Sequence, residues 1–121
     1  MADKIKVLKV EPHKAPEVAY IGTELSDLQE AVGGYIEFIY PENGVIIMLN
    51  EEGKLIGLEG NRYFGNDIIA GTFYVMGDDN EGDITSLPED KIQKYERIFH
   101  TPDDISPEEV ENAMGFSITF M

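Results

Sequence analysis

Residues 35–60 constrain the fold most, because three apolar runs of strand length alternate there with tight turns that contain glycine. Asn43-Gly44 lies between the first two runs, and this residue pair is preferred in type I′ hairpin turns. Gly53 lies between the second and third runs, where it is expected to supply the positive φ of another turn. The pattern predicts an antiparallel meander of three short strands, at residues 35–40, 44–50 and 54–60.

Alternating apolar and polar residues predict further strands outside this meander. These strands lie at residues 4–12, 16–22, 67–77 and 116–121. Gly71, in the middle of the third of them, indicates a bulge or a close approach of another backbone segment. The last run, FSITFM, either joins the sheet or forms an exposed edge that pairs with another subunit in a homo-oligomer. Residues 61–66 are expected to form a loop.

Helical spacing of apolar residues, together with start and stop signals, predicts three helices. They cover residues 23–34, 86–100 and 106–115. Thr23 or Ser26 is expected to cap the first helix, and a pair of glycines to end it. Ser86 and Glu89 have the spacing of a capping box at the start of the second helix. The third helix begins with a similar signature, and Gly115 is expected to end it.

The order of these elements predicts one α+β domain over residues 1–121. It would be a mostly antiparallel sheet, a meander of short strands, with two or three helices packed on one face. A chain of 121 residues can form a hydrophobic core without disulfides, and this chain has no cysteine. Residues 101–121 can form a C-terminal extension of the domain.

The formal net charge of −15, from 24 acidic and nine basic residues, limits the possible partners. An acidic surface repels phosphate groups, so direct binding to nucleic acid is not expected. Two interpretations remain open. The charge can serve solubility, or it can mimic nucleic-acid phosphates and occupy a basic groove on a partner protein. From Asp78 onward the chain holds twelve acids against three bases, compared with twelve against six before that residue.

The hydropathy pattern predicts no contact with membranes. No apolar stretch approaches the roughly 20 residues of a transmembrane helix. The N-terminal residues alternate in polarity and do not form the apolar core of a signal peptide. We therefore expect the protein in the cytoplasm.

The sequence offers no catalytic or metal-binding motif, so it predicts a protein that is not an enzyme and needs no cofactor. The acidic loop 78–83 does not match an EF-hand, because no register places its glycine and its twelfth-position acid together. His13 and His100 each lack a second ligand at metal-binding spacing. Phosphate-binding loops, serine-hydrolase elbows and dinucleotide fingerprints do not occur.

Arg62 is one of only two arginines in this acidic chain, and it is the centre of the candidate binding site. A guanidinium presents five donors to a phosphate or carboxylate, and neighbouring aromatic rings can stack on a nucleobase. Hydroxyl groups on the following strand could add contacts. The candidate ligand-binding residues are Asn61, Arg62, Tyr63, Phe64, Thr72 and Tyr74. The alternative is a structural ion pair, since a carboxylate is available to Arg62 in almost any direction.

Three segments together resemble a known family, namely LQEAVGGYIE (28–37), NEEGKLIGLEGNR (50–62) and DIIAGTFYVMG (67–77). In order and spacing they are similar to small bacterial and phage proteins described as domain of unknown function 3846. The resemblance implies an origin on a phage or another mobile element, and it implies no established activity. Family members carry a proline near the Asn-Arg pair, where this chain has Glu59-Gly60.

Two hypotheses follow for a small, acidic, non-enzymatic protein of such an origin. In the first, the protein sequesters a small anionic, nucleotide-like ligand near Arg62 and acts as a counter-defence factor. In the second, it is an interaction module whose acidic surface blocks a basic site on a host protein, as a nucleic-acid mimic would.

Overall fold

The computed structural model describes residues 4–119, which contain eight strands and three helices. In chain order they are β1 (Lys4–Val10), β2 (Glu17–Gly22), α1 (Leu25–Val32), β3 (Ile36–Glu42), β4 (Val45–Asn50), β5 (Gly60–Phe64), β6 (Asp67–Ala70), β7 (Phe73–Asp78), β8 (Ile84–Thr85), α2 (Glu89–Phe99) and α3 (Pro107–Thr119). The predicted α+β class is confirmed.

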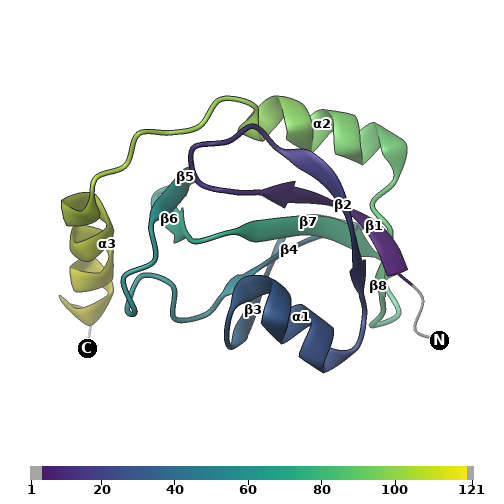
Figure 1. The fold of residues 1–121 in the computed structure, drawn as a ribbon, viewed down its shortest axis with the longest axis horizontal. Helices are drawn as coiled ribbons and strands as arrows, with labels where there is room; N and C mark the ends of the chain where they lie inside the picture. Colours follow the sequence, from purple (N-terminus) through teal and green to yellow (C-terminus); the bar gives the residue numbers. More distant parts are fainter. Residues whose placement is uncertain (1–3, 120–121) are drawn as a thin grey trace.

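Six strands form one antiparallel sheet in the order β2-β1-β7-β4-β3, with β8 also paired to β7. The central strand, β7, joins two hairpins from the first half of the chain, β1–β2 and β3–β4 (Figure 1). β5 and β6 form a separate hairpin at one end of the sheet. The mostly antiparallel sheet was predicted, but the insertion of β7 between the two hairpins was not.

The sheet is covered on both faces, because all six residues of β4 are buried. Val45 and Ile47 belong to a hydrophobic cluster with α2, whereas Ile46 and Met48 belong to a second cluster with α1. Figure 1 accordingly shows α2 above the sheet and α1 below it. The helices were expected on one face. The uninterrupted apolar run of β4 is the sequence signal of a strand that is buried on both sides.

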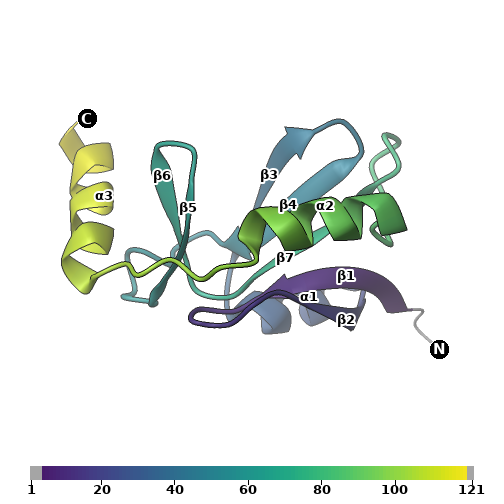
Figure 2. The same cartoon turned by 90° about the horizontal axis from the view of Figure 1, so that it is seen from above.

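α3 lies outside this main core and beside the β5–β6 hairpin (Figure 2). Ile105 and Val110 pack there with Ile68 and Ala70 of β6 in a small separate cluster. The C-terminal helix is therefore attached to the domain through its hairpin and not through the sheet.

The prediction of a third strand in the meander, at residues 54–60, is wrong. Residues 51–57 form a series of turns, and β5 occupies the segment that was expected to be a loop. Leu55 and Ile56 are 65% and 55% exposed, and only Leu58 of the large apolar side chains in this run packs against a hydrophobic cluster. Gly53 has no positive φ, but a Cβ at this position would lie 2.7 Å from a carbonyl oxygen of β6. Close packing, and not turn geometry, accounts for this glycine.

Gly71 divides the predicted long strand 67–77 into β6 and β7. Its φ of +85° is a conformation that residues with a side chain rarely adopt. A Cβ at this position would lie 2.6 Å from the Cδ1 atom of Leu58, and the Gly71 N–H donates to the carbonyl of Glu59 at 2.7 Å. The close approach expected at this glycine is therefore confirmed.

The turn between β3 and β4 lies at Asn43-Gly44 as predicted, but its type differs. Only Gly44 has a positive φ, of +86°, whereas a type I′ turn requires positive φ at both central residues. The position of a hairpin turn is thus easier to predict than its geometry.

The helix starts also differ from the predicted caps. Glu24 caps α1, in a reciprocal capping box with Asp27, in place of Thr23 or Ser26. The Ser86 hydroxyl does not cap α2, because it accepts a hydrogen bond from the Lys6 N–H at 2.8 Å. α2 therefore begins after Pro88.

The third capping signature is confirmed, but the predicted end of that helix is not. The Glu109 N–H donates to the Ser106 hydroxyl at 3.1 Å, and the Ser106 N–H donates back to the Glu109 carboxylate at 3.2 Å. α3 then continues through Gly115 to Thr119, so residues 116–119 are helical and not a strand. A single glycine costs a helix only about 1 kcal/mol and does not by itself end it. The remainder of the predicted strand, residues 120–121, lies outside the described residues.

Candidate functional site

Arg62 is buried in β5, with 1% of its surface exposed, and all five of its N–H donors are used within the protein. Nε and one Nη2 hydrogen donate to the carbonyl of Phe99, at 3.0 and 2.8 Å. Nη2 also donates to the carbonyl of Lys14 at 2.6 Å. Nη1 donates to the carbonyl of Asn61 at 3.2 Å and to its side-chain Oδ1 at 2.7 Å. The guanidinium therefore joins the end of α2 to the β1–β2 connection.

Asn61 completes this network beside Arg62. Its side chain is fully buried, and its Nδ2 donates to the carbonyls of Val10 and Gly71 at 2.8 and 2.9 Å. β5 has an irregular register between Gly60 and Arg62, which lets two successive polar side chains point inward. Among the described residues, no buried side-chain nitrogen or oxygen is left without a partner.

The charge of Arg62 is stabilised by oriented carbonyl dipoles and by one nearby carboxylate. Burial lowers the pKa of Arg62, and the negative charge of Asp103 raises it. Arginine remains protonated in proteins, so the side chain is a buried cation surrounded by acceptors. The predicted structural role is present in a different form, because the acceptors are main-chain carbonyls and not a paired carboxylate.

The other candidate residues do not gather around Arg62. Tyr63 is 45% exposed, and its hydroxyl donates to the Glu109 carboxylate of α3 at 2.5 Å. This contact raises the pKa of Tyr63 and lowers that of Glu109. Phe64 packs against Phe99, with 6.5 Å between ring centroids. Both aromatic side chains are thus engaged in holding helices.

Thr72 lies in the β6–β7 connection and Tyr74 on β7, and neither of these described side chains forms a hydrogen bond with this network. Thr72 is half-buried directly after Gly71. Tyr74 is 5% exposed in the cluster beneath α1, on the opposite sheet face from α2, and burial raises the pKa of its hydroxyl. The structure brings Asn61 and Arg62 together, and it does not arrange the six candidates around one cavity.

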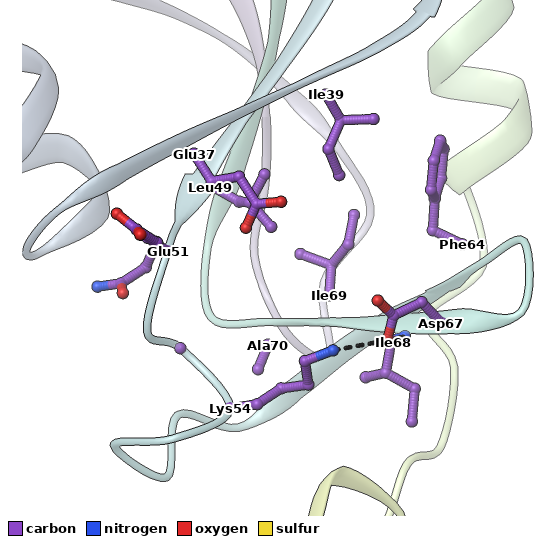
Figure 3. A pocket seen from close by; sticks show the side chains of 12 residues that line it. Glu37, Ile39, Leu49, Glu51, Lys54, Phe64, Asp67, Ile68, Ile69 and Ala70 are labelled. Atoms are coloured by element: carbon purple, nitrogen blue, oxygen red, sulfur yellow. Dashed lines mark hydrogen bonds and ion pairs between the residues drawn. The ribbon is translucent and has the colours of Figure 1, made fainter. Parts of the chain in front are cut away.

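A cavity of about 80 Å³ lies between β3, β4 and the β5–β6 hairpin (Figure 3). Its walls combine apolar side chains, such as Ile69 and Phe64, with an ion pair between Lys54 Nζ and Asp67 Oδ1 at 2.6 Å. Ligand pockets for nucleotide-sized molecules usually measure about 300–1,000 Å³. This cavity has room for a few water molecules and not for a nucleotide.

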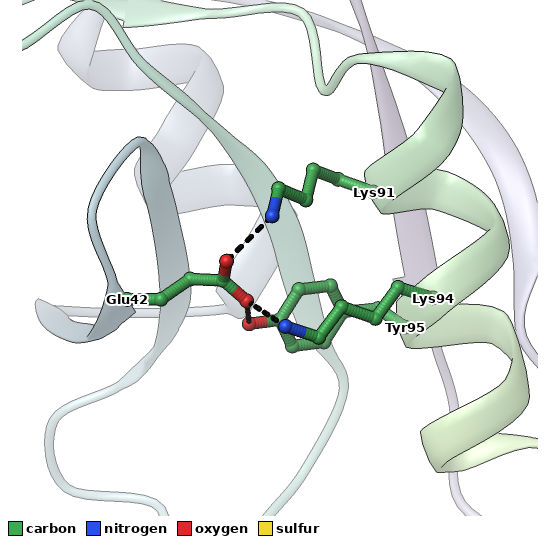
Figure 4. A network of polar contacts seen from close by, with 4 residues as sticks. All are labelled: Glu42, Lys91, Lys94 and Tyr95. Atoms are coloured by element: carbon green, nitrogen blue, oxygen red, sulfur yellow. Dashed lines mark hydrogen bonds and ion pairs between the residues drawn. The ribbon is translucent and has the colours of Figure 1, made fainter.

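Glu42, at the end of β3, is the centre of a second polar network (Figure 4). Lys91 Nζ, Lys94 Nζ and the Tyr95 hydroxyl of α2 each lie 2.6 Å from its carboxylate oxygens. These donors, with Lys91 the strongest, lower the pKa of Glu42 to about 2. The same carboxylate raises the pKa of Lys91. Because both oxygens accept from α2, this cluster ties an edge strand to a helix.

Most of the acids around α3, in contrast, have no basic partner among the described residues. Residues 101–121 contain five acidic residues and no lysine or arginine. Asp103 accepts the Tyr63 N–H at 3.0 Å, and Glu109 belongs to the capping box. The remaining three acids are exposed, without an ion pair among the described residues, and form the C-terminal acidic surface of Asp104, Glu108 and Glu111. The sequence count of acids after Asp78 pointed to this end of the chain, but not to these residues.

Comparison with known families now identifies the domain. The family described as "Domain of unknown function (DUF3846)" matches residues 5–100. The chain belongs to the DUF3846 family. The DUF3846 domain thus comprises the sheet, the β5–β6 hairpin, α1 and α2, whereas α3 follows the matched segment. No curated protein and no solved structure matches the chain.

Within residues 4–119, no three His, Cys, Asp or Glu side chains are grouped so that they could hold a metal ion. In the same part of the chain, none of the helices combines the length and the hydropathy needed to cross a bilayer.

Proposed function

We propose that this chain is a non-enzymatic binding protein whose C-terminal acidic surface occupies a basic site on a partner protein. The observation that carries the proposal is the absence of any base after Thr101, which leaves Asp104, Glu108 and Glu111 exposed and unneutralised within the described residues. A group of exposed carboxylates without nearby bases attracts a basic partner and repels nucleic acid. Counter-defence on a mobile element is the setting that the family resemblance suggests for such a protein.

Sequestration of a nucleotide-like ligand around Arg62 is the weaker alternative. A phosphate would need donors from Arg62, and all five already bind main-chain and amide oxygens of the protein. Releasing them would leave the carbonyls of Phe99 and Lys14 without these donors, at a cost of about 1–3 kcal/mol for each buried acceptor. An acidic interaction surface requires no such rearrangement.

Affinity capture from a bacterial lysate with a matched pair of triple variants tests the proposal. One variant carries Asp104→Asn, Glu108→Gln and Glu111→Gln. Its control carries the same change of charge elsewhere, through neutralisation of exposed carboxylates at Glu81, Asp83 and Asp90. Captured proteins are quantified by mass spectrometry.

We expect the full-length protein and the control to capture the same basic protein, and the first variant to lose it. The complex should dissociate between about 0.1 M and about 1 M salt, as the Debye length falls from about 10 Å to about 3 Å. Duplex DNA should displace it if the acids imitate phosphates. Equal loss in both triple variants, or a complex that resists salt, would contradict the proposal.

A further inference from the structure

A groove of about 550 Å³ lies between α3 and the turns that precede β5. Its apolar lining comes from both sides: Leu55 and Leu58 lie in the turns, Ile105 lies just before α3, and Val110 lies in its first turns. Figures 1 and 2 show α3 beside the β5–β6 hairpin at one end of the molecule. The groove is thus built between the DUF3846 domain and a helix that follows the matched residues.

The charges around this groove are predominantly negative. Glu59 and Glu111 line it, and the exposed Glu108 lies on the first turn of α3. The Glu59 carboxylate lies 2.8 Å from His13 Nε2. Lys54 is the one basic residue among its lining, and its ammonium is held by the Asp67 carboxylate at 2.6 Å. An apolar floor with an acidic rim favours an occupant that is apolar on one side and basic on its flanks.

We propose that this groove binds a basic amphipathic helix of a partner protein. Apolar side chains on one face of that helix would pack against Leu55, Leu58 and Val110, and its lysine or arginine residues would face Glu59 and Glu111. The inference rests on the proposed function, because it assigns the partner class and the position of contact to the same acidic end. A second copy of this chain is disfavoured as the occupant, since each copy carries a charge of −15.

The probe is a synthetic helical peptide of leucine and lysine with all its leucines on one face. A peptide of the same composition with its leucines dispersed around the helix is the control for amphipathicity. Leu55→Lys tests the groove, and Ile98→Lys on α2 is the matched control. Both residues are exposed, at 65% and 56%, so neither substitution disturbs the core and both change the charge equally. Circular dichroism confirms that each variant is folded.

Fluorescence anisotropy at about 0.1 M salt measures the peptide affinities. We expect the amphipathic peptide to bind the Leu55→Lys variant at least about tenfold more weakly than the unmodified protein, because one large apolar contact is lost. Ile98→Lys should change the affinity by less than about threefold. The dispersed peptide should bind more weakly than the amphipathic one to the unmodified protein.

The other outcomes overturn the inference in distinguishable ways. Equal binding of both peptides, with equal weakening by both variants, would reject the groove and leave the charge-driven function intact. No binding of either peptide to the full-length protein would reject the groove and the proposed function together. A dimer in light scattering that Leu55→Lys dissociates would show that a second copy is the occupant.

Discussion

Replacing Arg62 by methionine measures how much of the fold depends on this buried guanidinium. Methionine keeps most of the buried hydrocarbon volume, so the substitution removes the five donors without opening a large cavity. The main acceptors that lose their partners are the carbonyls of Phe99 and Lys14 and the Oδ1 of Asn61. The end of α2, the β1–β2 connection and β5 then lose their shared contact.

The expected loss of stability follows from these acceptors. Each buried acceptor without a donor costs about 1–3 kcal/mol. The Lys14 carbonyl is only partly buried and can bind water, and losses within one network are not additive. We therefore expect Arg62→Met to lower the free energy of unfolding by about 3–5 kcal/mol. In thermal unfolding, this corresponds to a decrease in Tm of about 10–20 °C for a domain of this size.

Urea denaturation followed by circular dichroism provides the free energies of unfolding. Arg97→Met is the matched control, because Arg97 is the other arginine and is exposed on α2. Exposed substitutions usually change stability by less than about 0.5 kcal/mol, with up to about 1 kcal/mol for a cation in the last helical turn. If both variants unfold at the urea concentration of the unmodified protein, Arg62 does not hold these elements together and the reasoning is refuted.

Three further predictions concern other contacts. The folded pKa of Glu42, about 2, lies below its ordinary value of 4.5, so its stabilisation is complete above about pH 4.5 and disappears as the pH falls toward 2. The urea midpoint should therefore fall less steeply with decreasing pH in Glu42→Gln than in the unmodified protein. Parallel curves of midpoint against pH for the two proteins would contradict this. Gly60→Ala places a Cβ 2.7 Å from the Cγ2 atom of Ile105, so we expect about 1–3 kcal/mol of destabilisation by urea titration, and an unchanged midpoint would disprove the clash. Tyr63→Phe removes an exposed hydrogen bond to Glu109 and should leave the urea midpoint almost unchanged. NMR titration should show the pKa of Glu109 rising, and an unchanged pKa would exclude this contact.

Periodicity in the sequence was sufficient to predict the elements with one apolar face. The helices and the β1–β2 and β3–β4 hairpins lie close to their predicted positions, because apolar runs bounded by turn and capping signals mark them in the sequence. β4 also carried a readable signal, since a run of six buried residues requires cover on both faces. The wrong prediction of a strand at residues 54–60 also comes from an apolar run. The side chains of this run are in part exposed beside the groove.

The role of Asn61 and Arg62 could not be predicted from neighbouring residues. Besides Gly71 and each other, their hydrogen-bond partners are Val10, Lys14 and Phe99, which lie 37 to 51 positions away in the chain. A rare cation in an acidic chain predicts an electrostatic contact of some kind, but not whether a ligand or main-chain carbonyls supply it. Only the tertiary arrangement decides this, because the carbonyls converge where α2 ends beside the β1–β2 connection.

Native mass spectrometry of the full-length protein tests the central claim most directly, namely that the acidic surface binds and Arg62 does not. The protein is incubated separately with the amphipathic leucine–lysine peptide and with a panel of linear, cyclic and ADP-ribose-type nucleotides. Our account predicts a peptide adduct that is lost as the salt concentration rises, and no nucleotide adduct. A nucleotide adduct that forms with the unmodified protein and disappears in a folded Arg62→Lys variant would contradict it.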